Sequence, residues 1–469
     1  MAVTAAAPEA SSGHCKPTME SAAEQQQNSF KDRDGTRVVA AAAATVETLV
    51  NAELEQDKSR FVLPEVSLLD RHADEPCHLR VTVIGAGIAG IVAGALLLAK
   101  VPGIELTIFE KNADVVGSAP SPPPPQCAFN SRLLTDEEKG GVWFENVYPG
   151  VCCNVPAHVY RTSFAPNTQW SEEYAQGPEL LDYWAGVARK YDVYKYLKVS
   201  HEVKDLQWDN EKSVWLVKVC NVQSREVRIH EADFVLTAIG RLNDWRLSDY
   251  PGINDFRDIS DTRRTGTRHM MSREREWQSL ATGRVATNLC HISRRSPGAN
   301  VDVLPPFGIT ANGKSIAQLW SPDGEYGFPY SYLGYATPGF PNLGFIQGPN
   351  GAGRSGTVPH NVEVQATYFA KILRKVGRER IKTMQPSKKA ANDFVQYSDA
   401  FFKKTVMSEC KSWYNTERPG SRIHGLWPGS AALVGLVVND PRWKDWEYEY
   451  LSDTENSLLG YFGNGCTKF

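Results

Sequence analysis

RVTVIGAGIAGIVAGALLLAKVPGIELTIFEK, residues 80–111, is the stretch that decides the fold. It begins with a β-branched run that is typical of a buried parallel strand. The glycine pattern G-x-G-x-x-G follows at 85–90, and the apolar, alanine-rich segment after it predicts a helix that ends before Pro102. A second apolar run at 105–109 predicts the next strand. Strand, glycine turn, helix and strand in this order indicate a βαβ unit of the Rossmann type and therefore an α/β fold.

Four residues of this unit predict a nucleotide site. Gly85 permits a tight turn, Gly87 lets the backbone approach a pyrophosphate, and Gly90 lets the helix pack on the strand. The helix N-terminus offers free N–H groups and a positive dipole to phosphates. Glu110 ends the second strand, where an acid accepts hydrogen bonds from an adenosine ribose. The glycine pattern alone is weak evidence, but the strand, the helix and the acid together predict a dinucleotide site.

Length and composition narrow the class of protein. The chain has 469 residues, enough for two or three domains, and its 42% hydrophobic and 22% charged residues are those of a soluble globular protein. A net charge of −3 provides no basic face, so we expect no nucleic-acid partner. The nine cysteines have no regular spacing and form no C-x-x-C pair, which predicts reduced thiols and no metal site.

Two further patterns bear on location. The N-terminus has no charged-then-apolar signal pattern, because acidic residues interrupt it early. The longest apolar run, at 87–99, is too short to span a bilayer and belongs to the glycine-motif helix. We therefore expect a cytoplasmic enzyme with no membrane span.

Beyond the βαβ unit, apolar periodicity predicts further elements and two irregular segments. A proline run within 118–140 cannot lie in a sheet or a helix interior and predicts a surface insert. The segment 257–299 holds nine arginines, no lysine and no countable period. It could be a loop for an anionic ligand, but the pattern favours a poorly packed insert. The regular elements that we expect are a helix within 171–197, strands near 204–208, 213–220, 226–230 and 234–240, and helices at 361–375 and 388–404.

A series of short motifs resembles one family, the flavin-containing monooxygenases of the Baeyer–Villiger type, and most closely their fungal members that act on polyketides in the sterigmatocystin and aflatoxin pathways. Several motifs are short, but their number and order make the resemblance strong. Besides the glycine motif and Glu110-Lys111, they are GVWFEN at 141–146, YPG at 148–150, AIGRLN at 238–243, SYLG at 331–334, FPN at 340–342, GPNG at 348–351, SWY at 412–414 and LWPGS at 426–430.

The resemblance implies that the dinucleotide is FAD. Val142 and Trp143 stand where the family places a small residue and a tryptophan against the flavin. Asn154 and Tyr160 stand at the family's flavin-contacting Asp and Tyr, and Val203 stands at its adenine-contacting Val. The change from Asp to Asn154 removes a carboxylate near the flavin, although an amide still forms hydrogen bonds.

The family's second nucleotide domain, which binds NADPH, has no visible counterpart. Neither a second G-x-G-x-x-G nor the preceding fingerprint follows residue 256, where the arginine-rich segment begins instead. The resemblance therefore divides the chain into four parts. Residues 1–60 are an N-terminal extension that is disordered or weakly helical, and residues 61–256, with the insert 118–140, are an FAD-binding domain. Residues 257–304 are a degenerate remnant of the NADPH domain, and residues 305–469 are a C-terminal part that returns to the FAD domain and adds helices.

One hypothesis covers both irregular segments: 118–140 resembles a retained intron, and 257–299 resembles translation in a shifted frame. It is motivated by two interruptions of otherwise well-matched sequence. Sequencing the spliced transcript tests it, and the presence of both segments there would refute it. The competing interpretation is a protein that has lost its NADPH domain and reuses the flavin scaffold.

By resemblance, the expected function is an FAD-dependent monooxygenase, with NADPH as reductant, O₂ as cosubstrate and a polyketide-like ketone as substrate. The family's catalytic arginine cannot be assigned to any residue, and His158, His201 and His360 are weak candidates because a lone histidine is more often structural. Two alternatives stay open. One is a flavoprotein without its own NADPH site, such as an oxidase, isomerase or cyclase, and the other is an inactive remnant.

Overall fold

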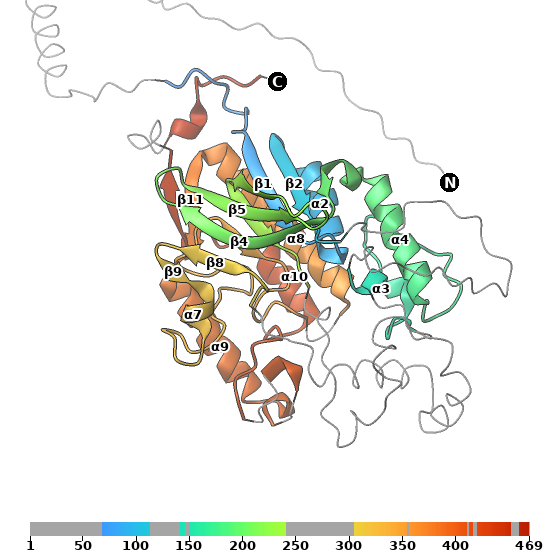
Figure 1. The fold of residues 1–469 in the computed structure, drawn as a ribbon. Helices are drawn as coiled ribbons and strands as arrows, with labels where there is room; N and C mark the ends of the chain where they lie inside the picture. The colour runs from blue at the N-terminus through green and yellow to red at the C-terminus, as the bar shows by residue number, and fades with distance from the viewer. Residues whose placement is uncertain are drawn as a thin grey trace, which may run out of the picture. The chain divides into compact units, whose positions relative to one another are not determined.

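The computed structural model describes residues 68–112, 141–145, 151–240, 304–353, 356–409, 412–415, 420–451 and 459–468. These residues lie in one compact unit, 68–469. The predictions for 1–60, for the insert 118–140 and for 257–299 concern residues outside the described ranges. The described strands form three sheets, and Figure 1 shows their arrangement.

The part of the chain that carries the glycine motif is built on a five-stranded parallel sheet of order β10-β7-β1-β2-β3. Its central strand β1 is almost entirely buried, as expected of a parallel strand covered on both faces. The predicted strand near 234–240 is confirmed as β7, which pairs with β1 in parallel. The strands are β1 (Leu79–Ile84), β2 (Ile104–Phe109), β3 (Leu197–Lys198), β7 (Phe234–Thr237) and β10 (Leu343–Phe345).

The helices next to this sheet lie where the sequence predicts them. The glycine-motif helix α2 (Ile88–Lys100) packs against α8 (Val358–Glu379), whose N-cap Thr357 accepts a hydrogen bond from the His360 N–H. Helix α4 (Gly177–Lys190) lies within the predicted range 171–197, and Pro178 in its first turn favours its observed start.

A second five-stranded sheet, of order β6-β5-β4-β8-β9, is mixed. The predicted strands in the region 204–230 are confirmed, although β4 starts earlier, at His201. The helix α7 (Ile316–Trp320) was not predicted, because five residues are too few to show a helical period. The strands of this sheet are β4 (His201–Asp209), β5 (Val214–Asn221), β6 (Val227–Ala232), β8 (Gly308–Ala311) and β9 (Lys314–Ser315).

The C-terminal part contributes a strand to the first sheet. Strand β10 joins it, α9 confirms the predicted second helix, and the tail tryptophans Trp427 and Trp446 are buried in the core. The short apolar helix α10 was not predicted. The remaining elements are β11 (Ile381–Pro386), α9 (Lys388–Phe402), α10 (Ala431–Asn439) and β12 (Trp446–Tyr450), with β11 and β12 paired antiparallel.

Two buried asparagines join segments that are distant in the chain, and one of them links the C-terminal part to the start of β7. Asn342, from the FPN motif, donates to the carbonyl oxygens of Asp233 and Lys382, both at 2.9 Å. Asn350, from the GPNG motif, donates to Ile423 O at 2.9 Å and to a second carbonyl nearby. Each asparagine has a positive φ, which Asn tolerates better than most residues. The two motifs therefore hold distant segments together.

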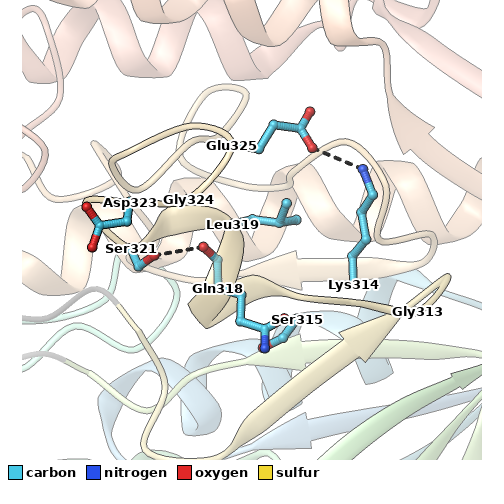
Figure 2. A pocket seen from close by; sticks show the side chains of 9 residues that line it. All are labelled: Gly313, Lys314, Ser315, Gln318, Leu319, Ser321, Asp323, Gly324 and Glu325. Carbon is cyan, nitrogen blue, oxygen red and sulfur yellow. Dashed lines mark hydrogen bonds and ion pairs between the residues drawn. The ribbon is translucent and has the colours of Figure 1, made fainter.

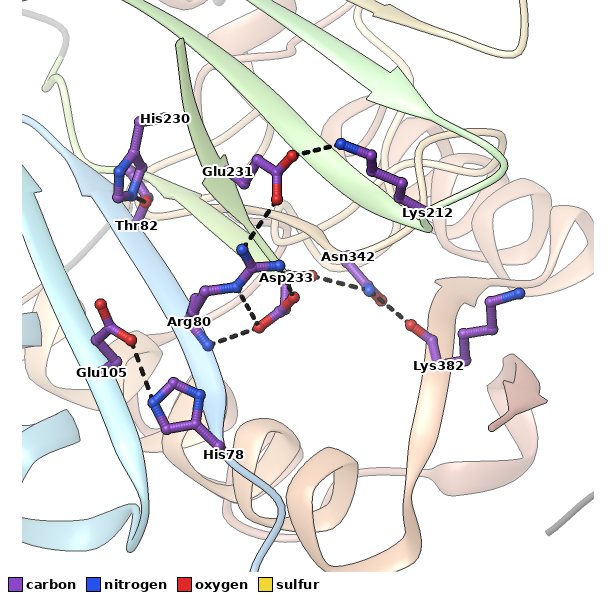
Figure 3. A network of polar contacts seen from close by, with 10 residues as sticks. All are labelled: His78, Arg80, Thr82, Glu105, Lys212, His230, Glu231, Asp233, Asn342 and Lys382. Carbon is purple, nitrogen blue, oxygen red and sulfur yellow. Dashed lines mark hydrogen bonds and ion pairs between the residues drawn. The ribbon is translucent and has the colours of Figure 1, made fainter. Parts of the chain in front are cut away.

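A network of polar contacts lies where strands of the parallel sheet begin, at their amino-terminal ends (Figure 3). The Arg80 guanidinium donates to Asp233 at 2.7 Å and to Glu231 at 3.1 Å, and the Arg80 backbone N–H also donates to Asp233 at 2.7 Å. Lys212 binds the other Glu231 oxygen at 2.7 Å. The network fixes the start of β1 to the turn between β6 and β7, at the edge opposite the glycine loop.

Candidate functional site

The glycine loop at the carboxyl end of β1 leaves no room for side chains. Gly85 has φ +101°, and a Cβ there would lie 2.8 Å from Ala238 O at the end of β7. A Cβ on Gly90 would lie 2.0 Å from Gly85 O. Both contacts are shorter than any real Cβ makes, so the turn and the packing of α2 require glycine at these positions. The structure thus gives both glycines the tasks that the motif predicted.

The N-terminus of α2 is open toward ligands. Its N-cap residue Gly87 forms no side-chain cap, so no side chain of that residue occupies the N–H groups of the first turn. Among the described residues, a Cβ on Gly87 would meet Gly141 Cα alone, at 3.8 Å. Backbone without side-chain cover at a helix N-terminus is the arrangement that binds a pyrophosphate. This cradle fits the phosphates of a dinucleotide.

Glu110 lies at the carboxyl end of β2, beside the glycine loop. Its carboxylate accepts hydrogen bonds from the Ala86 N–H at 2.8 Å, the Asn112 N–H at 3.0 Å and the Asn112 side-chain amide at 2.7 Å. The residue is 5% exposed. Burial raises the pKa of Glu110, and the N–H donors of Ala86 and Asn112 oppose that rise. An oriented carboxylate next to a glycine loop suits an adenosine ribose.

The predicted flavin residues Trp143 and Tyr160 contact one another. The short helix α3 (Val142–Glu145) begins next to Gly141, whose Cα lies near the glycine loop, and carries Trp143. The indole N–H of Trp143 donates to the Tyr160 hydroxyl at 3.2 Å, and the rings meet edge to face with centroids 5.8 Å apart. Burial raises the pKa of Tyr160, so its hydroxyl stays protonated and remains a donor.

The other predicted residues are distributed between the two ends of the site. Val203 is buried in β4, two residues after His201, whose backbone N–H donates to Glu110 O at 2.8 Å. It therefore lies toward the Glu110 end. Asn154 is exposed and follows Cys153, which shares a small apolar cluster with Trp143 and Tyr160. Val142 lies in α3 next to Trp143.

The sequence did not single out three residues that shape this site. Asn112 donates to the Glu110 carboxylate, Glu145 accepts from the same Asn112 amide, and Gly141 brings α3 against the glycine loop. Asn112 follows the strand-ending acid by two residues, which is the one signal that could have indicated it. Glu145 carries no such signal, because it is far from Glu110 in sequence and meets it only through the fold.

The histidine candidates do not form a catalytic centre in the described structure. His201 lies at the Glu110 end, where its ring contacts Phe109 and its Nδ1 lies 2.6 Å from Val199 O. His158 lies in the turn before Tyr160, and its backbone oxygen accepts a hydrogen bond from Arg161 at 2.8 Å. His360 belongs to the first turn of α8. The catalytic residue is therefore still unassigned.

A pocket of about 400 Å³ lies elsewhere, between β9, α7 and the turn that follows α7 (Figure 2). Its polar wall includes Lys314 and Glu325, which form an ion pair at 3.0 Å. It contains none of the predicted site residues, so we do not identify it with the nucleotide site. Its lining residues are Gly313, Lys314, Ser315, Gln318, Leu319, Ser321, Asp323, Gly324 and Glu325.

Within the described ranges, no group of three or more His, Cys, Asp or Glu side chains is arranged to hold a metal ion. Among the helices described, none has both the length and the apolar character needed to cross a bilayer.

Fold and site together define a nucleotide-binding α/β protein of the Rossmann type, and comparison with known proteins narrows this class. The NAD(P)-binding Rossmann-like domain family matches residues 83–135. The FAD-binding monooxygenase moxY of Dothistroma septosporum is 22% identical over 81% of this chain and 82% of its own length. The FAD-binding monooxygenase stcW of Emericella nidulans is 21% identical over 87% of this chain and 88% of its own.

Solved structures support the same fold. Cyclohexanone monooxygenase from Rhodococcus sp. Phi1 bound to NADP+ has a TM-score of 0.55 at 17% identity, with 80% of this chain and 100% of that chain covered. Oxidized steroid monooxygenase bound to NADP also has a TM-score of 0.55, at 15% identity, with 79% and 99% covered. The predicted fold class and the resemblance to flavin-containing monooxygenases are confirmed.

Proposed function

We propose that this chain is an FAD-dependent monooxygenase that performs a Baeyer–Villiger-type oxidation of a polyketide-like ketone in fungal secondary metabolism. The observation that carries the proposal is the glycine cradle with its oriented Glu110, because it fits a dinucleotide in a chain whose relatives are FAD-binding monooxygenases. The fungal setting rests on those relatives, which come from Dothistroma and Emericella.

In this proposal the chain's residues bind and orient FAD. The loop Gly85, Gly87 and Gly90 and the N-terminus of α2 hold the pyrophosphate, and Glu110 holds the adenosine ribose. The remaining assignments follow the family resemblance: Val203 contacts the adenine, and Val142, Trp143, Asn154 and Tyr160 line the flavin.

The cofactor supplies the redox chemistry, and the protein supplies orientation and exclusion of water. Overall, a ketone, O₂, NADPH and a proton give an ester or lactone, water and NADP+. The Trp143–Tyr160 pair contributes a rigid apolar wall, since each ring restrains the other through an edge contact and a hydrogen bond. The five cysteines in the described ranges form no disulfide, which suits the cytoplasm, where we place the enzyme.

Anaerobic reduction of the purified full-length chain tests the proposal. We expect a yellow protein whose flavin absorbance, near about 450 nm as for oxidised flavins in general, bleaches when NADPH is added. Subsequent addition of O₂ and a cyclic or polyketide-type ketone should give a product heavier by one oxygen atom. A colourless, folded protein would refute the proposal.

A second candidate is a flavoprotein without its own NADPH site, and one observation favours it. The alignment with moxY extends over 540 positions but uses 81% of this chain, or about 380 of its 469 residues. About 160 positions therefore have no residue of this chain, which is the size of a domain. We propose that the missing part is the NADPH domain, of which 257–304 is the remnant. Bound flavin that stays oxidised in NADPH would favour this candidate.

A further inference from the structure

Two carboxylates at the carboxyl end of β2 share one asparagine. The side-chain amide nitrogen of Asn112 lies 2.7 Å from Glu110 Oε1 and 3.2 Å from Glu145 Oε1. An amide nitrogen has two hydrogens, so each carboxylate receives one of them. The two carboxylates thereby determine which way the amide points, because the opposite orientation would turn its oxygen toward them. Asn112 is thus held from both sides.

This arrangement fixes Glu110 in place. With Asn112 oriented, Glu110 Oε1 receives the Asn112 backbone and side-chain N–H groups, and Oε2 receives the Ala86 N–H of the glycine loop. Three N–H donors on one buried carboxylate determine its orientation and favour its ionised form. Glu145 is the partner that completes the clamp, since it orients Asn112 from the side away from Glu110.

Glu145 also neutralises the nearest cation. Lys111 follows Glu110 directly in the chain, a position from which a cation can pair with a phosphate on the ribose 2′ oxygen. Its Nζ lies 3.8 Å from Glu145 Oε1, and the Glu145 side chain is only 9% exposed, whereas that of Lys111 is 54% exposed. The charge that would attract a 2′-phosphate is therefore offset by a largely buried carboxylate.

We infer that Glu145, acting through Asn112, positions Glu110 and makes this site selective for dinucleotides with a free adenosine 2′-hydroxyl, and that it excludes those with a 2′-phosphate. The inference rests on the proposed function, in which this loop binds FAD. The inference concerns the glycine-loop site alone. This loop lies within the residues that match a family described as NAD(P)-binding, and that description does not distinguish dinucleotides with a 2′-phosphate from those without one. It follows that NADPH does not enter through this loop.

Competition binding to the full-length apoprotein tests the inference without any turnover. Bound FAD is followed by flavin fluorescence, and ADP-ribose and 2′-phospho-ADP-ribose are the competitors. The wild type should prefer ADP-ribose by at least about a hundredfold, and Glu145→Gln should reduce that preference about tenfold, because it removes one charge from the site. Glu447→Gln is the matched control, since it removes an exposed carboxylate from β12 and should leave the preference unchanged.

A second variant separates positioning from simple structural support. Asn112→Asp keeps the shape but places a third carboxylate between the two, so FAD should bind about tenfold or more weakly. Adding Glu145→Gln should restore part of that loss, a coupling that independent structural damage would not produce. Circular dichroism confirms that each variant is folded.

The possible results are distinguishable. If the wild type binds neither FAD nor ADP-ribose, the proposed function fails. If it binds FAD but takes both competitors equally well, or if Glu145→Gln leaves the preference intact, the inference on Glu145 is overturned while the proposed function stands.

Discussion

The adenosine end and the flavin end of the proposed cofactor site are built differently. The core of the adenosine end, the glycine loop with Glu110, comes from one continuous stretch, 79–112, and consists of tight glycine contacts and N–H groups directed at Glu110. At the flavin end, Trp143 and Tyr160 lie on separate segments and contact each other through aromatic edges. The difference indicates that nucleotide binding depends on local geometry, whereas the surroundings of the flavin depend on how separate segments pack.

The largest effect should come from breaking the adenosine end. Gly90→Val places side-chain atoms where even a Cβ would lie 2.0 Å from Gly85 O. Because the obstacle is backbone, α2 must move away from β1, and we expect a loss of about 3 kcal/mol or more in unfolding free energy and no FAD binding. Urea unfolding and flavin fluorescence measure both.

A glycine in another helix provides the control for this variant. A Cβ on Gly186, within α4, would meet nothing within 4 Å. Gly186→Ala should therefore stabilise the protein by about 0.5–1 kcal/mol through helix propensity, with unchanged FAD affinity. If Gly90→Val left both the unfolding free energy and FAD affinity as intact as Gly186→Ala does, the conclusion that the glycine loop has no room for a side chain would be wrong.

A smaller effect is expected at the flavin end. Tyr160→Phe keeps the edge-to-face ring contact but removes the oxygen that accepts the Trp143 indole N–H. A lost acceptor in this half-buried pair should cost about 1–2 kcal/mol of stability, and FAD affinity should change by less than about threefold. Tyr397→Phe, at an exposed tyrosine, is the control and should change neither quantity. A complete loss of FAD binding by Tyr160→Phe would erase the contrast between the two ends.

A substitution at the amino-terminal ends of the parallel strands, opposite the glycine loop, should lower the unfolding free energy without changing FAD affinity. Asp233→Asn weakens the contacts to the Arg80 backbone and guanidinium and should cost about 1 kcal/mol. FAD affinity should stay the same, because this network lies at the amino ends of the strands (Figure 3). Glu226→Gln, in an exposed pair with Arg228, should leave the unfolding free energy essentially unchanged. A change in FAD affinity for Asp233→Asn would contradict the separation of the two edges.

The smallest effect concerns pH. Burial, aided by Arg80, lowers the pKa of His230, whose Nε2 lies 3.0 Å from Thr82 Oγ1. Folding therefore favours the neutral ring, so its contribution to stability is complete above the unfolded value of 6.5 and is lost as the pH falls through the folded pKa. Glu110 acts in the opposite direction, since burial raises its pKa.

Comparing two variants separates these contributions. Between about pH 7.5 and about pH 5, wild-type protein should lose more unfolding free energy than His230→Gln and less than Glu110→Gln. Urea unfolding at both pH values is the measurement. Equal losses in all three proteins would show that neither group titrates differently in the folded state.

How well the sequence predicted a helix or strand depended on how many repeats of its apolar period that element contains. The βαβ unit, the strands β4, β5 and β6 and the long helices α8 and α9 were predictable, since each shows several repeats of its apolar period. The helices α7 and α10 were not, because α7 is very short and α10 is apolar on every side.

By itself, the sequence determined that a glycine turn at 85–90 and an acid at Glu110 would form a nucleotide site, because these residues lie within one local unit whose geometry follows from glycine sterics and strand periodicity. Only the tertiary structure decided which groups surround that acid. Glu145 reaches Asn112 from a helix more than thirty residues away in the chain, since Gly141 packs against Gly87. Such contacts carry no periodicity, so the sequence alone does not reveal them.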